Sequence, residues 1–374
     1  MEAPTYSSKQ VAEMLGVSPK QIPEASRKDA YTPDDIWELR TTLNAFPARL
    51  GHRRQLFLNF KGGTGKTSLS TSYAWRLAEL GYAVLLIDLD SQGHATKCLG
   101  YEGEDFEKTL LDVLVRKTPL AKVVQKSTLP NLDFIPSNLT MSTMDLALMP
   151  MAGREFKLRN ALKDVEAQYD VIVFDAPPSF GLLNLNALMA ANDLFVPVLA
   201  DFLSFHGLKL LFETVQSLEE DLNHVLDHVF IVVNSFNATF KLAKEALEAL
   251  QTHYPEFLLP TIIRQCTKFA QASSEGRPVF VADPTSKGAS DIQAMIDNIL
   301  PRLVAAAPPP RRRAPSRPAE NRHEESLRTE RVPRQAPPPP GCADRPHRPG
   351  RVPPRPPSPR PLARSSAPAR PPRP

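Results

Sequence analysis

The order of hydrophobic and polar residues between positions 55 and 304 predicts short buried strands that alternate with amphipathic helices. Several apolar runs are rich in Val, Ile, Leu and Phe, which is typical of strands covered on both faces in a parallel sheet. We expect strands at 55–60, 83–89, 132–137, 170–176, 193–199, 228–234 and 258–263, and helices at 66–80, 155–167, 206–221 and 241–253. This alternation predicts an α/β fold with a mostly parallel, twisted sheet flanked by helices.

The two ends of the chain have different patterns. We expect a small helical module at 1–46, a linker at 47–54, the α/β domain at 55–304 and a disordered tail at 305–374. Residues 308–374 hold 22 of the 39 prolines, 16 arginines, five acidic residues and no lysine, so their net charge is +11 and that of the first 307 residues is −7. Such a tail favours extended polyproline segments and suits either an electrostatic arm or a passive extension.

The composition limits the classes of protein that fit. The chain has 374 residues, of which 42% are hydrophobic, enough for one large or two small cores. There is no run of 18 apolar residues and no basic-then-apolar leader, so we expect neither a membrane span nor secretion. The three cysteines, Cys98, Cys266 and Cys342, are too widely spaced for a disulfide framework or a metal site, which favours a reducing cytoplasm.

A glycine-rich loop follows the first predicted strand, in the segment LFLNFKGGTGKTSLS (56–70). Glycines adopt positive φ and let the backbone approach a ligand, so successive N–H groups form an anion site at the positive end of the next helix. In such a loop Lys66 would neutralise the β- and γ-phosphates of ATP, and the Thr67 hydroxyl would coordinate Mg²⁺. A turn without a ligand is the alternative, but Gly-Lys-Thr between a buried strand and a helix favours the phosphate site.

A second lysine, Lys61, precedes the glycines and distinguishes this loop from an ordinary P-loop. The run Lys-Gly-Gly-Thr-Gly-Lys-Thr, from Lys61 to Thr67, resembles the deviant Walker A motif of the ParA/MinD ATPases, which position DNA and protein cargo in bacteria. The resemblance implies a P-loop NTPase fold and a dimer that sandwiches two nucleotides. In that dimer Lys61 would reach the phosphates bound by the partner subunit. A solvated loop lysine is the alternative for this position.

Two acidic segments extend the resemblance. LLIDLDSQGHAT (85–96) is similar to switch I of the family, which implies that Asp90 orients the attacking water and that Asp88 lies beside Mg²⁺. DVIVFDAPPSFG (170–181) is similar to the Walker B strand and switch II, which implies that Asp175 holds Mg²⁺ through water.

Two further segments resemble the parts of the family that surround the base. VVNSF (232–236) places Asn234 where many members contact adenine, and residues 261–280 resemble the segment that closes over the base and ends in Gly-x-Pro. By resemblance, the nucleotide-binding residues are Lys61, Gly62, Gly63, Thr64, Gly65, Lys66, Thr67, Ser68, Asn234 and Pro278, the Mg²⁺ residues are Thr67, Asp88 and Asp175, and the catalytic residues are Lys61, Lys66 and Asp90.

The resemblance also implies how the protein works. We expect ATP to drive formation of a homodimer, the dimer to bind non-specific duplex DNA, and a centromere-binding or cargo adaptor protein to stimulate a slow hydrolysis that releases it. The protein would partition or position a plasmid, a chromosome or a protein complex, in the cytoplasm and on the nucleoid, without a membrane partner. Lys241 and Lys268, with Lys244 and Arg264 nearby, are the candidate DNA contacts of the ATPase domain.

The first residues resemble a separate DNA-binding unit. YSSKQVAEMLGVSPKQI (6–22) has the apolar rhythm of a helix-turn-helix, with Ser18 at the start of the second helix. The pattern resembles the N-terminal part of MerR-type DNA-binding domains, which implies that Lys20 and Gln21 face the major groove. A degenerate helix-turn-helix that recruits a partner is an equal alternative, because Pro23 shortens the second helix.

Other functions share parts of this pattern. A sequence-specific DNA-binding regulator, an operator autorepressor tuned by nucleotide, is the main alternative and would prefer one short DNA site even with ADP. A MinD-like membrane ATPase would need an amphipathic targeting helix. A reductase like the nitrogenase iron protein would need paired cysteines for its cluster, and a bacterial tyrosine kinase would need a cluster of tyrosines. We find none of these features in the sequence and expect none of the three activities.

Overall fold

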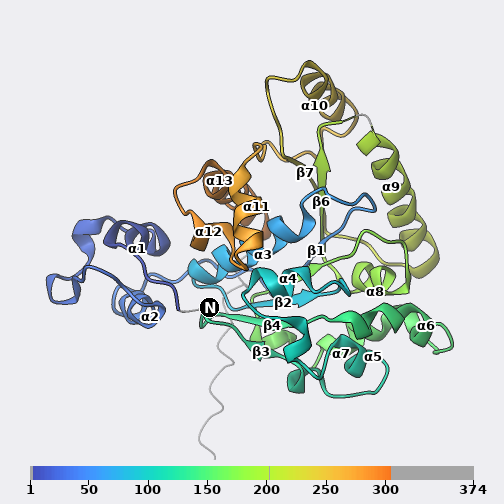
Figure 1. The fold of residues 1–374 in the computed structure, drawn as a ribbon, viewed down its shortest axis with the longest axis horizontal. Coiled ribbons are helices and arrows are strands. Elements are labelled where there is room, and N and C mark those ends of the chain that lie inside the picture. Colours follow the sequence, from blue (N-terminus) through green and yellow to red (C-terminus); the bar gives the residue numbers. More distant parts are fainter. Residues whose placement is uncertain (1–2, 202, 305–374) are drawn as a thin grey trace, which may run out of the picture. The chain divides into compact units, whose positions relative to one another are not determined.

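A seven-stranded sheet forms the centre of the structure, a computed structural model that describes residues 3–201 and 203–304 (Figure 1). The strand order is β3-β4-β2-β5-β1-β6-β7, and all pairs are parallel except β3 with β4. The strands are β1 (Arg53–Phe57), β2 (Val84–Asp88), β3 (Gln125–Lys126), β4 (Leu132–Ile135), β5 (Val171–Asp175), β6 (Asp193–Leu199) and β7 (His228–Asn234). The mostly parallel α/β sheet expected from the sequence is confirmed.

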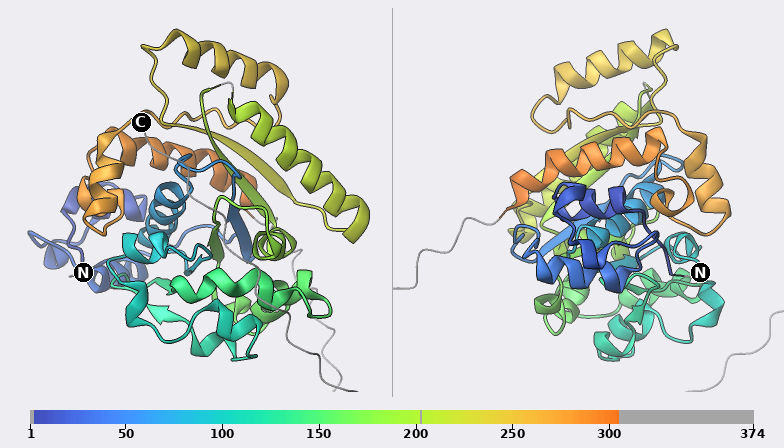
Figure 2. Two further views of the ribbon diagram at one scale, coloured as in Figure 1. Left: turned by 45° about the vertical axis from the view of Figure 1, so that its right-hand side comes forward. Right: turned by 90° about the vertical axis from the view of Figure 1, so that its left-hand side faces the viewer.

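Helices cover both faces of this sheet (Figures 1 and 2). They are α1 (Ser8–Leu15), α2 (Pro33–Thr42), α3 (Lys66–Glu79), α4 (His94–Cys98), α5 (Leu110–Leu114), α6 (Met144–Leu148), α7 (Lys157–Leu162), α8 (Leu182–Ala190), α9 (Leu203–Leu222), α10 (Lys241–His253), α11 (Thr267–Ser274), α12 (Val279–Ala282) and α13 (Lys287–Leu303). One hydrophobic core joins a face of the sheet to α5–α9, and a second core joins the other face to α3, α4, α12 and α13. Parallel strands need crossover helices of this kind.

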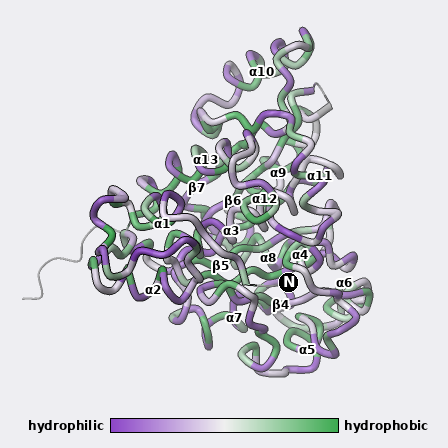
Figure 3. Tube along the Cα trace, turned by 60° about the vertical axis from the view of Figure 1, so that its left-hand side comes forward, coloured by the Kyte–Doolittle hydropathy of each residue, from purple (hydrophilic) through white to green (hydrophobic). Residues whose placement is uncertain are grey.

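The interior strands are buried along their whole length. Every residue of β2 and β5 is buried, and Figure 3 shows hydrophobic residues concentrated along the central strands and α8, whereas α10 alternates between hydrophobic and hydrophilic residues. The parallel register places Asp175 beside Asp88 on one side and Phe57 on the other. The carboxyl ends of β1, β2 and β5 therefore meet at one edge, which is where α/β sheets bind ligands.

The predicted strands differ from the observed strands in two places. Residues 258–263 form no strand, so this prediction was wrong. Leu258 makes an isolated bridge to Ile231, and the N–H of Leu259 donates to the Ile231 oxygen at 2.9 Å. The next main-chain hydrogen bond to β7 comes from Ile263, whose N–H donates to the Val233 oxygen at 2.8 Å, so the pairing is interrupted between Leu259 and Ile263. The second place is β3, which was not predicted because a strand of two residues is too short to produce a hydrophobic pattern.

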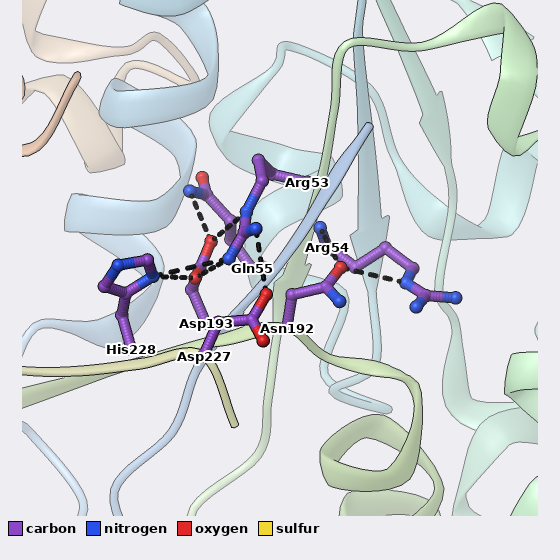
Figure 4. Close-up of polar contacts among 7 residues, drawn as sticks. All are labelled: Arg53, Arg54, Gln55, Asn192, Asp193, Asp227 and His228. Atoms are coloured by element: carbon purple, nitrogen blue, oxygen red, sulfur yellow. Dashed lines mark hydrogen bonds and ion pairs between the residues drawn. The ribbon is translucent and has the colours of Figure 1, made fainter. Parts of the chain in front are cut away.

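A buried ionic network joins the amino ends of three strands (Figure 4). The carboxylate of Asp193 in β6 is fully buried and accepts hydrogen bonds from Arg53 and Gln55 in β1. The same carboxylate lies 2.9 Å from Nδ1 of His228 in β7, and Arg53 also pairs with Asp227 at 2.9 Å. A buried charge is tolerated when it is paired and hydrogen-bonded, so this network helps to hold β1, β6 and β7 in register.

Residues 3–46 form a small module in which one expected helix is missing. α1 ends at Gly16, which has a positive φ of 65°. The expected second α-helix is a 3₁₀ turn of three residues, Pro19–Gln21, so that prediction was wrong. Ile22 is extended because it precedes Pro23, and a residue before proline disfavours helical geometry. The MerR-type resemblance of this segment stays a prediction.

The module contacts the carboxyl end of α3. Tyr6 donates its hydroxyl to Oε1 of Glu79 at 3.0 Å, and Trp75 donates to the same oxygen at 2.9 Å. The buried guanidinium of Arg40 donates to the main-chain oxygens of Glu79 and Met14, at 3.2 Å each. A cation is favourable at the end of a helix, where carbonyl groups lack partners. The module and the α/β domain are therefore joined by buried polar contacts.

The remaining boundary predictions concern the linker and the tail. Residues 45–52 contain no helix or strand, and β1 includes the last two residues of the predicted linker at 47–54. The predicted tail at 305–374 lies outside the described residues. Within the part of the chain that the structure describes, no helix has both the length and the hydropathy to cross a membrane.

Candidate nucleotide-binding site

The glycine-rich loop connects β1 to α3 at the carboxyl edge of the sheet. Gly63 and Gly65 have positive φ values of 73° and 87°, a conformation that favours glycine. A Cβ atom at Gly65 would lie only 2.1 Å from Nδ2 of Asn234, whereas Cβ atoms at Gly62 and Gly63 would meet open space. No described side chain caps the first turn of α3, so its N–H groups are free to bind an anion.

Side chains of α3 meet the predicted magnesium ligand of β5. Thr67 donates its hydroxyl to Oδ2 of Asp175 at 2.7 Å, and Ser70 donates to Oδ1 at 2.9 Å. The Lys66 side chain is buried, and its ammonium donates to the main-chain oxygen of Lys61 at 3.3 Å. Burial lowers the pKa of Lys66, while the charge of Asp175 opposes this shift. The structure thus brings Lys66, Thr67 and Asp175 together.

Asp88 and Asp175 are buried carboxylates at the ends of neighbouring strands. Burial raises the pKa of Asp88 to about 8, with a further contribution from the charge of Asp175, and burial raises the pKa of Asp175 to about 6. Thr96 donates its N–H and its hydroxyl to Oδ2 of Asp88, at 2.8 Å each. Carboxylate and hydroxyl oxygens are the ligands that Mg²⁺ prefers. The residues present, with Thr67, therefore fit a magnesium ion.

Asp90, the predicted water-orienting residue, lies in the turn after β2. Its N–H donates to Oδ1 of Asp88 at 3.1 Å, and its own Oδ1 accepts the N–H of Gln92 at 3.0 Å. Asp90 is partly exposed, unlike the two buried acids. The turn therefore attaches a solvent-accessible carboxylate directly to a candidate magnesium ligand.

An aromatic contact links the loops that follow β1 and β5. The rings of Phe60 and Phe180 meet edge to face with their centroids 5.2 Å apart. Phe180 is 71% exposed, and both rings border an apolar groove of about 650 Å³ between α8 and α9. A movement of the segment after β5 would therefore change the packing of Phe60, the residue that precedes Lys61.

Lys61 itself pairs with an acid that no sequence motif contains. Its ammonium lies 2.7 Å from Oδ2 of Asp201, which follows β6. One signal in the sequence points to Asp201: it lies two residues after a strand whose carboxyl end is at the ligand-binding edge. The pairing itself depends on β6 lying next to β1, which only the fold shows.

Asn234 and Thr64 meet beneath the loop. Nδ2 of Asn234 donates to the main-chain oxygen of Thr64 at 2.8 Å, so this side chain supports the loop, and its contact with adenine stays a prediction. The Thr64 hydroxyl is buried and has no hydrogen-bond partner among the described residues. An unpaired buried hydroxyl in a loop with free N–H groups fits a polar ligand.

The segment predicted to close over the base packs on α3. Pro278 is buried directly before α12, and the N–H of Val279 lies 3.5 Å from the hydroxyl of Ser72 in α3. Ser68 is partly exposed in the first turn of α3. The structure therefore places Ser68 in the helix that follows the loop and Pro278 beside a residue that contacts that helix, and their contacts with nucleotide stay predictions.

The DNA-binding candidates lie on separate elements. Lys20 and Gln21 are exposed in the 3₁₀ turn of the module. Lys241 begins α10 and lies 3.5 Å from Glu245, and Lys268 in α11 lies 3.5 Å from Asp283. Arg264 forms a bidentate pair with Asp291, and Lys244 is exposed in α10. These pairs weaken the positive field that a DNA-binding surface needs.

Three features define a P-loop nucleotide-binding protein. They are a mostly parallel sheet, a glycine-rich loop between β1 and its following helix, and a lysine-threonine pair opposite a buried acid at the end of a strand. Comparisons with known proteins agree with this class. A family described as an AAA domain matches residues 55–228. The cell division protein PomZ of Myxococcus xanthus is 97% identical over 307 residues, which cover 82% of this chain and 96% of that protein. The sporulation initiation inhibitor protein Soj of Bacillus subtilis is 35% identical over 231 residues, 62% of this chain and 91% of that protein.

Solved structures share the fold. Cobyrinic acid a,c-diamide synthase from Mycobacterium smegmatis, with a bound ATP analogue and magnesium, has a TM-score of 0.58 and 26% identity over 66% of this chain and 94% of its own. An ATP complex of a McdA variant from Cyanothece has a TM-score of 0.60 and 22% identity over 67% of this chain and 97% of its own, a likeness of fold alone. The chain belongs to the ParA/MinD-type family of P-loop ATPases.

Proposed function

We propose that the protein is a ParA-type positioning ATPase, which dimerises with ATP, binds duplex DNA without sequence preference and is released when a partner protein stimulates hydrolysis. A role in placing the division machinery is favoured over plasmid partition, because the relative that is 97% identical is a cell division protein. The observation that carries the proposal is the set of Lys66, Thr67, Asp88 and Asp175 gathered around an uncapped helix end, with a second lysine, Lys61, in the same loop.

The chemistry follows from the positions of these groups. Thr67, Asp88 and Asp175 would hold Mg²⁺, which supplies charge neutralisation for the phosphates when bound. Lys66 would add positive charge at the loop, and Asp90 would orient the attacking water from the turn after β2. Phosphoryl transfer to water needs such positioning more than covalent help. Hydrolysis is slow in a single chain because Lys61 of a second chain completes the site.

The direct test is Lys61→Ala. The variant should still bind a fluorescent ATP analogue, because Lys66 and the loop N–H groups remain, but it should lose ATP-dependent dimers in light scattering. Lys244→Ala, which removes an equal charge from the exposed surface of α10, is the matched control and should dimerise normally. Dimers of Lys61→Ala that persist would show that Lys61 does not act across the interface.

The rival function, an operator-binding regulator, makes a different prediction. A positioning ATPase should bind arbitrary duplex only with ATP, with an affinity that falls steeply as salt rises. A regulator should prefer one short site, even with ADP. The missing second α-helix in the module favours the ATPase, because helix-turn-helix proteins read sequence with that helix. Selection from a random duplex library with ATP and with ADP separates the two.

A further inference from the structure

The carboxylate of Asp88 accepts hydrogen bonds from the segment that follows it, residues 90–96. Thr96 donates both its N–H and its hydroxyl to Oδ2, at 2.8 Å each, and Asp90 donates its N–H to Oδ1 at 3.1 Å. The two oxygens of a carboxylate offer about four acceptor positions between them. Oδ2 is therefore fully used by Thr96, whereas Oδ1 keeps one position for a metal ion or for one of its waters.

The hydroxyl of Thr96 has a defined direction. Its oxygen accepts the N–H of Ser137 at 3.1 Å, so its proton is left for Oδ2 of Asp88. Thr96 is 1% exposed and Ser137 is fully buried, so water does not compete for these two bonds. The hydroxyl thus connects the acid at the end of β2 to the segment that follows β4.

Ser137 is held in place by two glycines. It lies two residues beyond the end of β4, the strand that pairs with β2. A Cβ atom at Gly93 would lie 2.8 Å from the main-chain oxygen of Ser137, and a Cβ atom at Gly103 would lie closer still. Two segments of main chain therefore pack directly against this oxygen, which only glycine allows. The hydroxyl of Thr96 is anchored to the sheet through Ser137, and not only to the turn that precedes α4.

We propose that Thr96 is a positioning residue for magnesium, which holds Oδ2 of Asp88, leaves Oδ1 for the metal site and so sets the affinity for Mg²⁺. The inference rests on the proposed function, since it takes Asp88 as a residue of the magnesium site. Thr96 would act through Asp88 without touching the metal. A carboxylate that serves a metal is commonly held by a partner behind it, and loss of such a partner lowers metal affinity about 10- to 100-fold.

The first experiment measures magnesium affinity through stability rather than through turnover. Thr96→Val keeps the shape and the main-chain N–H of the residue and removes only the hydroxyl. In thermal melting with saturating ADP, half of the gain from added Mg²⁺ should need about 10-fold more Mg²⁺ in this variant than in the parent. Thr96→Ser keeps the hydroxyl, so its midpoint should stay close to that of the parent. Thr109→Val removes a buried hydroxyl that caps α5 and is the matched control, whose midpoint should not move.

The valine and serine variants separate positioning from packing. If Thr96 only filled space, Thr96→Ser would move the midpoint more than Thr96→Val, because serine lacks the methyl group that valine keeps. That order, or an unmoved midpoint in Thr96→Val, would overturn the inference. If the valine variant does not fold, Thr96→Ala and Thr96→Ser give the same comparison without the methyl group. Affinity for a fluorescent ADP analogue in EDTA should equal that of the parent, since Lys66 and the loop N–H groups are unchanged, and a loss there would also contradict the inference.

The second experiment tests whether Thr96 acts through Asp88. Asp88→Asn alone should raise the Mg²⁺ midpoint, and the addition of Thr96→Val should not raise it further, because the carboxylate that Thr96 positions is gone. Two effects that multiply would mean that Thr96 acts independently of Asp88, contrary to the inference. A parent that gains no stability from ADP and Mg²⁺ would instead refute the proposed function.

Discussion

The two ends of the central strands carry buried acids in opposite situations. At the amino ends, Asp193 is bonded to Arg53, Gln55 and His228, so its charge is balanced within the chain (Figure 4). At the carboxyl ends, Asp88 and Asp175 lie side by side and are bonded to hydroxyl and main-chain N–H groups. Lys66, whose charge acts on Asp175, donates its ammonium to a main-chain oxygen instead.

This difference separates charges that stabilise the fold from charges that serve a ligand. A buried acid with a buried cation is satisfied by folding alone. Two adjacent buried acids without a bonded cation raise each other's free energy, and a divalent ion with phosphate removes that cost. The comparison therefore predicts that substitutions of buried acids at the two ends have opposite effects on stability.

The largest effect is expected at the amino ends. Asp193→Ala would remove the buried acid that pairs with Arg53 and leave the half-exposed Asp227 as the acid bonded to it, and it should lower the free energy of unfolding by about 3–5 kcal/mol. Urea unfolding without nucleotide measures this change. Asp227→Ala removes the half-exposed partner of the same arginine and should cost less than about 1 kcal/mol. Equal losses in the two variants would mean that burial does not set the strength of this network.

The next effect concerns catalysis rather than folding. Asp90→Ala should slow ATP turnover by about 100-fold or more, because an unoriented water attacks poorly, and it should leave a long-lived ATP dimer. The free energy of unfolding should change by less than about 1 kcal/mol, since Asp90 is partly exposed and accepts one main-chain hydrogen bond. Single-turnover kinetics and light scattering measure the two properties. Unchanged turnover would exclude Asp90 as the group that orients water.

Hydrophobic periodicity predicted most of the strands, but it failed in segments where local backbone geometry determines the secondary structure. The strands that became β1, β2, β4, β5, β6 and β7 are long enough to show their burial, and the helix at 241–253 was placed at its observed bounds. The strand expected at 258–263 pairs with β7 only near its two ends, and the second helix of the module fails at Pro23. In the module, one proline outweighs the apolar pattern around it.

The candidate site was predictable to the extent that its residues are close in sequence. The loop from Lys61 to Thr67 is one continuous motif, and Asp88 and Asp175 each lie in a short segment that resembles a motif of the family. Asp201 was not predictable, because its pairing with Lys61 spans 140 positions and depends on which strand lies beside β1. Long-range pairs of this kind follow from strand order, which the pattern of apolar residues does not contain.

The third prediction is a gain in the free energy of unfolding, whereas the first is a loss. Asp175→Asn should stabilise the chain without nucleotide or magnesium by about 1–3 kcal/mol at pH 8, because it removes a buried charge, and the hydroxyls of Thr67 and Ser70 can rotate to suit an amide. The pKa of Asp175 is raised to about 6, so the parent loses stability as pH rises through 6. The gain should therefore shrink at pH 5, where the parent acid is largely protonated.

Thermal melting at the two pH values, with and without Mg²⁺ and ATP, measures this effect. The parent should gain stability from Mg²⁺ and ATP, and Asp175→Asn should gain much less. Asp193→Asn serves as the control at the amino ends and should destabilise at both pH values. If Asp175→Asn were destabilising at pH 8 without ligand, the acids at the carboxyl ends would be satisfied by the fold, and the contrast between the two ends would be lost.

The smallest effect tests a third buried acid, which joins the N-terminal module to α3. Glu79 resembles Asp193, because it is balanced within the chain by Tyr6, Trp75 and Arg76. Tyr6→Phe removes one of these three bonds and should lower the free energy of unfolding by about 0.5–1.5 kcal/mol. Tyr101→Phe, whose hydroxyl makes a long bond of 3.4 Å at the surface, should cost less. Equal costs would mean that the module is not held by Glu79. A clear difference would place the module with the folded ATPase domain, so that any DNA or partner it binds acts on the end of the helix that begins at Lys66.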